Sequence, residues 1–230
     1  MVALAGRADT ASVTSTALPA EAVSANEIYD RVQAYYEAKL ALHGASPQGV
    51  DWSCAATQWL RFVQLLKICP LDTAFSLIDV GCGYGALAAF LADRYPQADV
   101  DYLGVDVSPV MIRRARRRFR GDPKKRFLVG RSCPGRTDYA VASGIMNIRL
   151  GVSIALWEDL VRATLADMRN KSTKGFAVNF LATPPPSAPP DMTYSAPPSK
   201  WVRFCQEELG CATDLRDGYG LGEYTLLARC

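Results

Sequence analysis

The chain has 230 residues, a net charge of +3, 49% hydrophobic residues and 21% charged residues. These values are ordinary for a globular protein with one buried core, and the small net charge indicates no particular class of partner. No stretch approaches the ~18 apolar residues that a membrane-spanning helix needs, so the sequence predicts a cytoplasmic protein without a membrane span.

The N-terminal part of the chain is predicted to be a tail followed by helices. Residues 1–24 are rich in Ala, Ser and Thr and lack the pattern of a secretory signal, so we expect a flexible tail. Apolar side chains recur at three- and four-residue steps over 25–43, which predicts a helix with Asn26 as its N-cap. A second helix is predicted over 54–68. Together they form a helical cap, residues 25–70.

Residues 71–230 alternate short apolar runs with helical segments and are predicted to form the core of a single domain, residues 25–230. Strands are predicted at 75–80, 101–107, 126–129, 139–143 and 175–181, and helices at 86–95, 109–120, 157–168 and 200–209. Two last strands are predicted at 212–215 and 222–229. This order predicts an α/β fold: a Rossmann-like, doubly wound, mostly parallel seven-stranded sheet with an antiparallel C-terminal hairpin strand. The proline-rich segment 182–198 is predicted to be a long connection.

A glycine loop, Asp79-Val-Gly-Cys-Gly-Tyr-Gly85, follows the first strand and opens a helix. Its glycines let the backbone turn tightly and approach a ligand, and the helix start presents free N–H groups. Asp106 ends the next strand, where its carboxylate can accept hydrogen bonds from both hydroxyls of a ribose. The GxGxG spacing differs from the GxGxxG of dinucleotide sites, which disfavours a nicotinamide oxidoreductase.

The glycine loop and the segment Val105-Asp-Val-Ser108 resemble the first two motifs of class I S-adenosylmethionine-dependent methyltransferases. The resemblance implies a glycine loop under the methionine and ribose of S-adenosylmethionine, with Asp106 on the ribose and Asp79 supporting the loop. One departure is Gly130-Arg-Ser132, which lacks the aspartate that many members carry near the adenine. The cofactor-binding residues that the resemblance implies are Asp79, Gly81, Gly83, Gly85, Asp106, Val107, Arg131, Ser132 and Ser143.

Further motifs resemble a bacterial subgroup of the same family, and with them the resemblance covers residues 26–230. It implies S-adenosylmethionine as methyl donor and S-adenosylhomocysteine as product, and it names no acceptor. The motifs are Tyr35-Tyr-Glu-Ala-Lys39, His43-Gly44, Gly49-Val-Asp-Trp52, Gln58-Trp-Leu-Arg-Phe62, Ser143-Gly-Ile-Met-Asn147, Asn179-Phe-Leu181 and Tyr224-Thr225.

Two residues are candidates for a catalytic role. Methyl transfer from a sulfonium is an in-line displacement in which the protein mainly positions the reactants and excludes water, and a base is needed only for a protonated nucleophile. His43 is the only imidazole and suits a base near neutral pH, but at a helix end it equally serves the helix dipole. Tyr36 is the member of an adjacent tyrosine pair that we expect to face the pocket.

Four residues are candidates for ligand contacts. Arg61 either pairs with the methionine carboxylate of the cofactor in a bidentate manner or is exposed. Asn147 and Asn179 follow the fourth and fifth strands, at the sheet edge where ligands bind, although asparagine is also common in turns there. Trp52 lies in a loop that is placed to cap the site. We assign Arg61 to the cofactor and the other three to the substrate.

The run from Arg113 to Arg120 holds six arginines in eight residues. It allows the hypothesis of a nucleic-acid methyltransferase that binds phosphates, but the run lacks a series of interleaved aromatic residues for base stacking, which favours a solvated helix face. We therefore expect a small-molecule acceptor methylated on O, N or C. A non-catalytic module that binds the cofactor is a further alternative, and the oligomeric state is left open.

Seven cysteines and the single histidine restrict metal and redox chemistry. No two cysteines form a Cys-x-x-Cys pair and no cluster of carboxylates stands out, so we expect no metal site. The odd number and irregular spacing of the cysteines argue against a disulfide framework and favour a reducing compartment.

Overall fold

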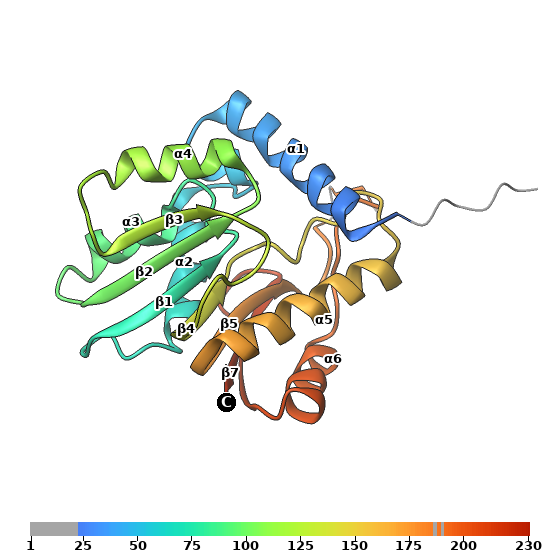
Figure 1. Ribbon diagram of the computed structural model, residues 1–230. Helices are drawn as coiled ribbons and strands as arrows, with labels where there is room; N and C mark the ends of the chain where they lie inside the picture. Colours follow the sequence, from blue (N-terminus) through green and yellow to red (C-terminus); the bar gives the residue numbers. More distant parts are fainter. Residues whose placement is uncertain (1–22, 186–187, 190) are drawn as a thin grey trace, which may run out of the picture.

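The computed structural model describes residues 23–185, 188–189 and 191–230 (Figure 1). Most of the predicted tail, residues 1–22, and three residues of the proline-rich connection therefore lie outside the described residues. Of the described helices, none is long and apolar enough to cross a bilayer.

Two helices precede the sheet, α1 (Ala25–His43) and α2 (Ala55–Leu66), joined through a 3-10 turn at Pro47–Val50. The predicted N-cap of α1 is wrong by two residues. Ser24 is the cap, because its hydroxyl accepts from the N–H of Glu27 while the Glu27 carboxylate accepts from the N–H of Ser24.

The sheet has seven strands in the order β3-β2-β1-β4-β5-β7-β6. The first five strands run parallel, and β7 runs antiparallel to both of its neighbours. This confirms the predicted fold class, with the hairpin strand β7 inserted between β5 and β6. The strands are β1 (Phe75–Val80), β2 (Val100–Asp106), β3 (Lys125–Val129), β4 (Thr137–Ala142), β5 (Ser172–Leu181), β6 (Ala212–Arg216) and β7 (Glu223–Arg229).

Helices cover both faces of the sheet, and α1 runs across its carboxyl end (Figure 1). One buried cluster joins the sheet to α2, α3 and α4, and another joins it to α5 and α6. The two clusters take alternate residues of each strand, such as Leu77 and Ile78 of β1, as the pleat requires. The remaining helices are α3 (Ala86–Arg94), α4 (Pro109–Arg118), α5 (Ile154–Lys171) and α6 (Pro198–Arg203), which continues into a π-helical turn at Phe204–Glu208.

The order of strands reverses direction at β1, because β2 and β3 lie on one side of it and β4 and β5 on the other. The connections that leave β1 and β4 therefore diverge at the carboxyl end of the sheet. In open α/β sheets, such a switch point is where ligands bind.

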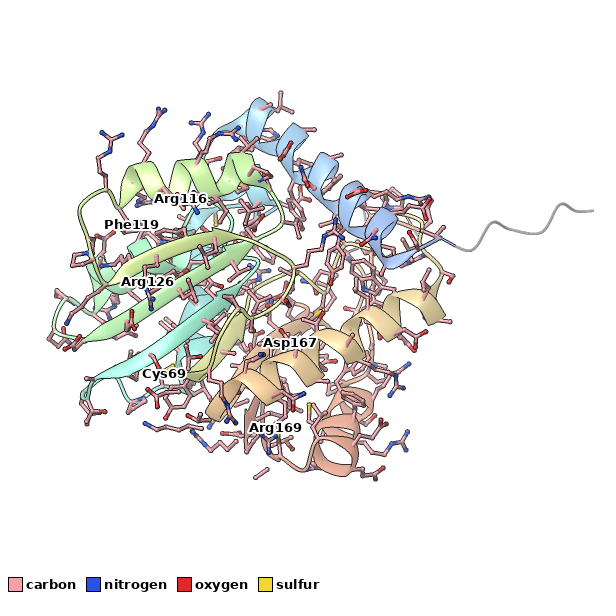
Figure 2. All side chains as sticks on the ribbon, in the orientation of Figure 1. Cys69, Arg116, Phe119, Arg126, Asp167 and Arg169 are labelled. Carbon is pink, nitrogen blue, oxygen red and sulfur yellow. A yellow bond between two sulfur atoms is a disulfide. The ribbon has the colours of Figure 1, made fainter. Side chains whose placement is uncertain are left out.

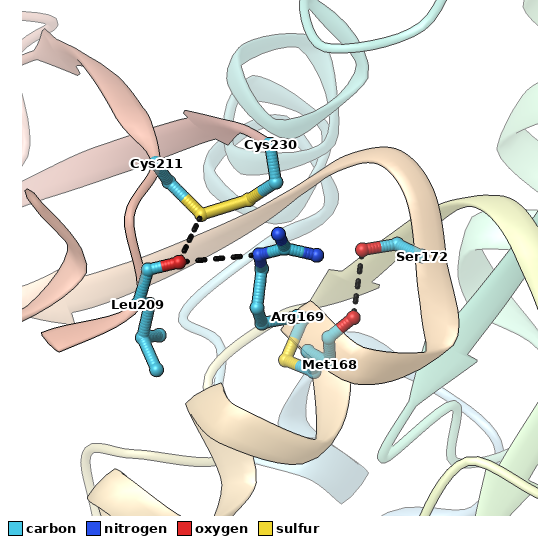
Figure 3. The surroundings of a disulfide bond; sticks show 6 residues. All are labelled: Met168, Arg169, Ser172, Leu209, Cys211 and Cys230. Atoms are coloured by element: carbon cyan, nitrogen blue, oxygen red, sulfur yellow. Dashed lines mark hydrogen bonds between the residues drawn. A yellow bond between two sulfur atoms is a disulfide. The ribbon is translucent and has the colours of Figure 1, made fainter.

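A disulfide joins Cys211 and Cys230, 19 residues apart, at the edge of the sheet (Figure 3). The expectation from cysteine spacing is wrong for this pair. Antiparallel pairing of β6 with β7 sets Ala212 opposite Arg229, which brings the flanking cysteines to a Cα–Cα distance of 4.5 Å. Beside the bridge, Nε of Arg169 donates to the Leu209 carbonyl at 3.2 Å. The other five cysteines are free thiols.

Candidate active site

The glycine loop between β1 and α3 has a backbone that only glycine adopts readily. Gly81, Gly83 and Gly85 all have positive φ, at 75°, 55° and 81°. A side chain at Gly81 would also meet Cγ2 of Ile145 at 2.1 Å. The loop is tied to β2, since the N–H of Gly81 donates to the Val105 carbonyl at 2.8 Å. This geometry leaves a cradle in which a ligand can approach the backbone.

Asp106 ends β2 beside the loop and is held by backbone hydrogen bonds. Its two carboxylate oxygens accept from the N–H of Gly83 at 2.9 Å and of Ser108 at 2.8 Å. Burial raises the pKa of Asp106, while these two hydrogen bonds act to lower it. The carboxylate still borders the cavity described below, so its remaining lone pairs can accept from a ligand.

Asp79 is buried under the glycine loop and accepts a hydrogen bond from the Tyr102 hydroxyl. Burial raises the pKa of Asp79 to about 7, and the Tyr102 hydrogen bond opposes that shift. Asp79 borders a small void shared with Cys82 and Tyr84 rather than the main cavity. It therefore supports the loop from below.

The main cavity lies at the switch point and encloses about 990 Å³ of space free of atoms, part of it open to solvent. One wall comes from α1, whose lining residues follow helical spacing and so share one face. The opposite wall comes from α5, and the floor from the ends of β1, β2 and β4. The two helices contribute Tyr29, Val32, Gln33, Tyr36, Trp157, Leu160, Val161 and Thr164.

Hydrogen bonds and ion pairs at two places along α1 hold it over this cavity. Glu37 accepts from the Ser108 hydroxyl at 2.7 Å. Asp51 accepts from the Tyr35 hydroxyl at 2.5 Å and pairs with Lys39 at 2.7 Å. Near the N-terminus of the helix, Arg131 pairs with Asp30 and donates to the side chain of Asn26. The helix is thus held near its N-terminus and in its C-terminal half.

Arg131 follows β3 and borders the cavity. Its guanidinium pairs with Asp30 at 3.2 Å, donates to the side chain of Asn26, and lies 5.0 Å from the ring centroid of Tyr29. The positive charge of Arg131 is therefore already matched by residues of α1.

The Ser143 hydroxyl follows β4 and borders the cavity without a hydrogen-bond partner among the described residues. A buried polar group without a partner is rare in folded proteins and marks a place where a ligand can supply one. With the glycine cradle and Asp106, it gives the polar groups that a nucleoside joined to an amino acid requires. The residues present therefore fit S-adenosylmethionine.

Comparison with known proteins identifies the family. A family model described as a methyltransferase domain matches residues 77–175. Rv1506c of Mycobacterium tuberculosis, whose name assigns it to the methyltransferases, is 38% identical over 165 residues, which are 71% of this chain and 98% of that protein. This chain is a class I S-adenosylmethionine-dependent methyltransferase. S-adenosylmethionine is its cofactor.

Two further similarities are more limited. Trans-aconitate 2-methyltransferase of Methylobacterium nodulans is 39% identical over 79 residues, 31% of this chain and 29% of that protein. The crystal structure of human N-acetylserotonin methyltransferase in complex with S-adenosylmethionine superposes with a TM-score of 0.58 at 16% identity, over 92% of this chain and 60% of that one. The latter similarity shows the fold alone.

Many of the predicted site residues border the cavity of this methyltransferase, and several others do not. The predicted residues that lie outside its lining are Asp79, Gly85, Ser132, His43, Arg61, Asn147 and Asn179. Gly85 caps α3 and Ser132 is exposed. The predicted residues that border the cavity are Tyr36, Trp52, Gly81, Gly83, Asp106, Val107, Arg131 and Ser143.

The structure does not bring His43 or Arg61 to the cavity. His43 is exposed at the C-terminal end of α1. A positive charge at that end of a helix interacts favourably with the helix dipole. Arg61 is 7% exposed and pairs with Glu223, so its guanidinium faces a protein carboxylate rather than a cofactor carboxylate.

Asn147 and Asn179 are buried behind the cavity wall and bind backbone groups. Oδ1 of Asn147 accepts from the N–H of Leu181 at 3.2 Å, and Oδ1 of Asn179 accepts from the N–H of Gly144 at 2.8 Å. Both asparagines thus hold the chain after β4 and β5 in place rather than border the cavity.

Sequence analysis missed several lining residues and one buried acid. Tyr29 and Gln33 share the spacing of Val32 and Tyr36 along α1, so the helical period could have found them. No sequence signal links Glu223 to Arg61, which lies 162 residues earlier. Among the described residues, no group of three or more His, Cys, Asp or Glu side chains could hold a metal ion.

Proposed function

We propose that this methyltransferase transfers the methyl group of S-adenosylmethionine to a small-molecule acceptor bound under α1. When bound, the cofactor supplies an electrophilic sulfonium methyl. The observation that carries the proposal is the wall that α1 forms over the cavity, held by Glu37, Asp51 and Arg131. Such a wall leaves room for a small acceptor and limits the access of water to it.

We infer that the acceptor carries little negative charge. The α5 wall and the segment after β4 are mostly apolar, with Ile145, Met146, Trp157 and Leu160 among their residues. Arg131 is the one cation in the described lining, and residues of α1 already match its charge. A buried polycarboxylate without cationic partners is unfavourable, so an acceptor such as trans-aconitate fits this cavity poorly.

We also infer that this chain contributes positioning rather than a proton acceptor. Burial raises the pKa of Tyr36 well above its ordinary value, so its hydroxyl stays protonated and serves as a hydrogen-bond donor. No histidine borders the cavity in the described part of the chain. The proposed acceptor is therefore one whose nucleophilic atom is free at neutral pH.

The first test is calorimetric titration with S-adenosylmethionine and S-adenosylhomocysteine, with a nicotinamide dinucleotide as control. Binding of the first two alone supports the site. The protein is then incubated with methyl-labelled cofactor and two acceptor panels matched in size. One panel is apolar with a single nucleophile that is free at neutral pH, such as an aromatic amine or a heteroaromatic nitrogen, and the other is polycarboxylic. Label in the first panel supports the proposal, and label in trans-aconitate alone contradicts it.

A second candidate function rests on the arginines of α4. Side chains with nitrogen ends extend outward from this helix, whereas Arg116 bonds the Phe127 carbonyl of β3 (Figure 2). The others form no ion pair among the described residues, a pattern that suits a polyanion. These exposed arginines are Arg113, Arg114, Arg117 and Arg118 of α4, with Arg120 two residues after the helix.

Nucleic-acid binding at two salt concentrations tests this second function. If nucleic acid is the acceptor, its affinity falls by about 10³-fold between 50 and 200 mM salt, and Arg113→Glu with Arg117→Glu weakens it. Binding that is absent at low salt rejects the nucleic-acid function.

A further inference from the structure

We propose that Arg61, Glu223 and Asn179, here called the Glu223 network, are positioning residues that fix Trp52 and Gly144 in the cavity wall. None of the three borders the cavity, whereas Trp52 and Gly144 do. The inference rests on the proposed site being where cofactor and acceptor bind, and it does not depend on which acceptor is used.

The centre of the network is a buried ion pair between α2 and β7. Nε of Arg61 donates to Oε2 of Glu223 at 2.7 Å, and Nη2 donates to Oε1 at 2.6 Å. The side chains are only 8% and 2% exposed. The third nitrogen of the guanidinium donates to the Thr57 carbonyl at 2.8 Å. Removing either partner leaves an uncompensated buried charge, which strongly destabilises its surroundings.

A second set of hydrogen bonds runs from Glu223 to the backbone after β4. Oε2 of Glu223 also accepts from Nδ2 of Asn179 at 2.9 Å. Oδ1 of Asn179 accepts from the N–H of Gly144 at 2.8 Å. The amide therefore has one orientation, in which its oxygen faces Gly144 and its nitrogen faces the carboxylate. Gly144 is held where its φ is 79°, a value that favours glycine.

Trp52 contacts Arg61 at one end of the network and Gly144, which Asn179 binds at the other end. The guanidinium carbon of Arg61 lies 3.8 Å from the centroid of the indole ring. A Cβ at Gly144 would lie 2.4 Å from Cζ2 of the same ring. The indole thus occupies the volume that any side chain at position 144 would need. The planar guanidinium of Arg61 stacks on the indole ring, an arrangement that arginine makes better than lysine.

Two variants test the network directly, with S-adenosylhomocysteine as probe in calorimetry. Glu223→Gln keeps the shape and removes the charge that Arg61 needs. Arg61→Lys keeps the charge and removes the planar stack on Trp52, so it serves if Glu223→Gln fails to fold. At metal sites, loss of an outer partner weakens binding by about 10–100-fold, and we expect about tenfold here for either variant.

The matched control is Asp138→Asn, which breaks an ion pair with Lys174 at the other end of the sheet. We expect unchanged affinity for S-adenosylhomocysteine in this control. The fluorescence emission of Trp52 is assigned by difference from Trp52→Phe. The proposal would be overturned if Arg61→Lys kept both the affinity of the parent chain and this emission.

A double-mutant cycle separates positioning from general stability. If the network acts through Trp52, Glu223→Gln changes the affinity by less than about twofold in a Trp52→Leu background. A full tenfold effect in that background shows a merely structural role and overturns the inference. Asp106→Ala is measured in parallel: parent-like affinity in that variant means that the site assignment fails, whatever the network does.

Discussion

The Glu37 carboxylate of α1 accepts a hydrogen bond from the Ser108 hydroxyl at the start of α4, with 2.7 Å between the oxygens. The same hydroxyl accepts from the N–H of Met111, and the N–H of Ser108 donates to Asp106. One serine therefore links the helix over the cavity, the cap of α4 and the carboxylate that we assign to the ribose.

Glu37→Ala is expected to loosen α1 and weaken S-adenosylhomocysteine binding by about five- to tenfold, because a hydrogen bond to a charged group contributes about 1.5 kcal/mol or more. Amide hydrogen exchange in α1 rises in the same variant. Glu207→Ala, an exposed acid of the π-helical turn, is the control. Unchanged exchange in α1 contradicts a holding role for Glu37.

Asp106→Ala is expected to weaken binding of S-adenosylmethionine by about 100-fold, because two hydrogen bonds between a ribose and a carboxylate are lost. Calorimetry measures the affinity. Asp101→Ala removes an exposed acid of the same strand, paired with Arg126, and leaves affinity unchanged. Equal affinity in Asp106→Ala and the parent chain rules out the ribose assignment.

Asp79 predicts a dependence of folding stability on pH. Burial raises its pKa to about 7, above the ordinary value of 3.8, so the folded state holds a proton that the unfolded state releases between those values. Stability therefore falls as pH rises through this window, by on the order of 4 kcal/mol at 1.36 kcal/mol per unit.

Asp79→Asn keeps an acceptor for Tyr102 and removes this titration. Urea unfolding at pH 5, 6, 7 and 8 is expected to show an advantage of the variant that grows up to about pH 7 and then levels off. A pH-independent difference between the two proteins would refute the elevated pKa.

The disulfide predicts a loss of stability on reduction. Closing a loop of 19 residues removes about 3 kcal/mol of unfolded-state entropy, so Cys211→Ala with Cys230→Ala lowers the free energy of unfolding by about that amount. Affinity for S-adenosylhomocysteine stays the same, because neither cysteine borders the cavity. Thiol titration in denaturant checks the bridge: five thiols react before reduction and seven after it.

Local patterns predicted most of the fold. The helix over 25–43 and the strand over 75–80 are observed with the predicted bounds, since each has a clear period and a clear stop. The helix predicted over 157–168 extends over Ile154–Lys171. The Ser153 cap that starts it is a weak signal in one sequence, and its last residues, Arg169-Asn-Lys171, are polar and lie outside the apolar period.

The site was predicted only as far as contiguous motifs reach. The glycine loop and Asp106 lie close in sequence and were found together, whereas the partners of Arg61 come from β7, far along the chain. The sequence alone does not distinguish an arginine that binds a cofactor from one that binds a distant glutamate. Antiparallel pairing of β6 and β7 likewise placed two cysteines that spacing alone did not connect.

The face that α1 turns to the cavity runs from Tyr29 to Tyr36, two turns of one helix and about 10 Å at 1.5 Å per residue. A helix of this length moves as a stiff rod. A ligand that displaces Tyr36 therefore displaces Tyr29 as well. Ligands at the two ends of the cavity are thus coupled through rigid-body movement of α1 rather than through the sheet.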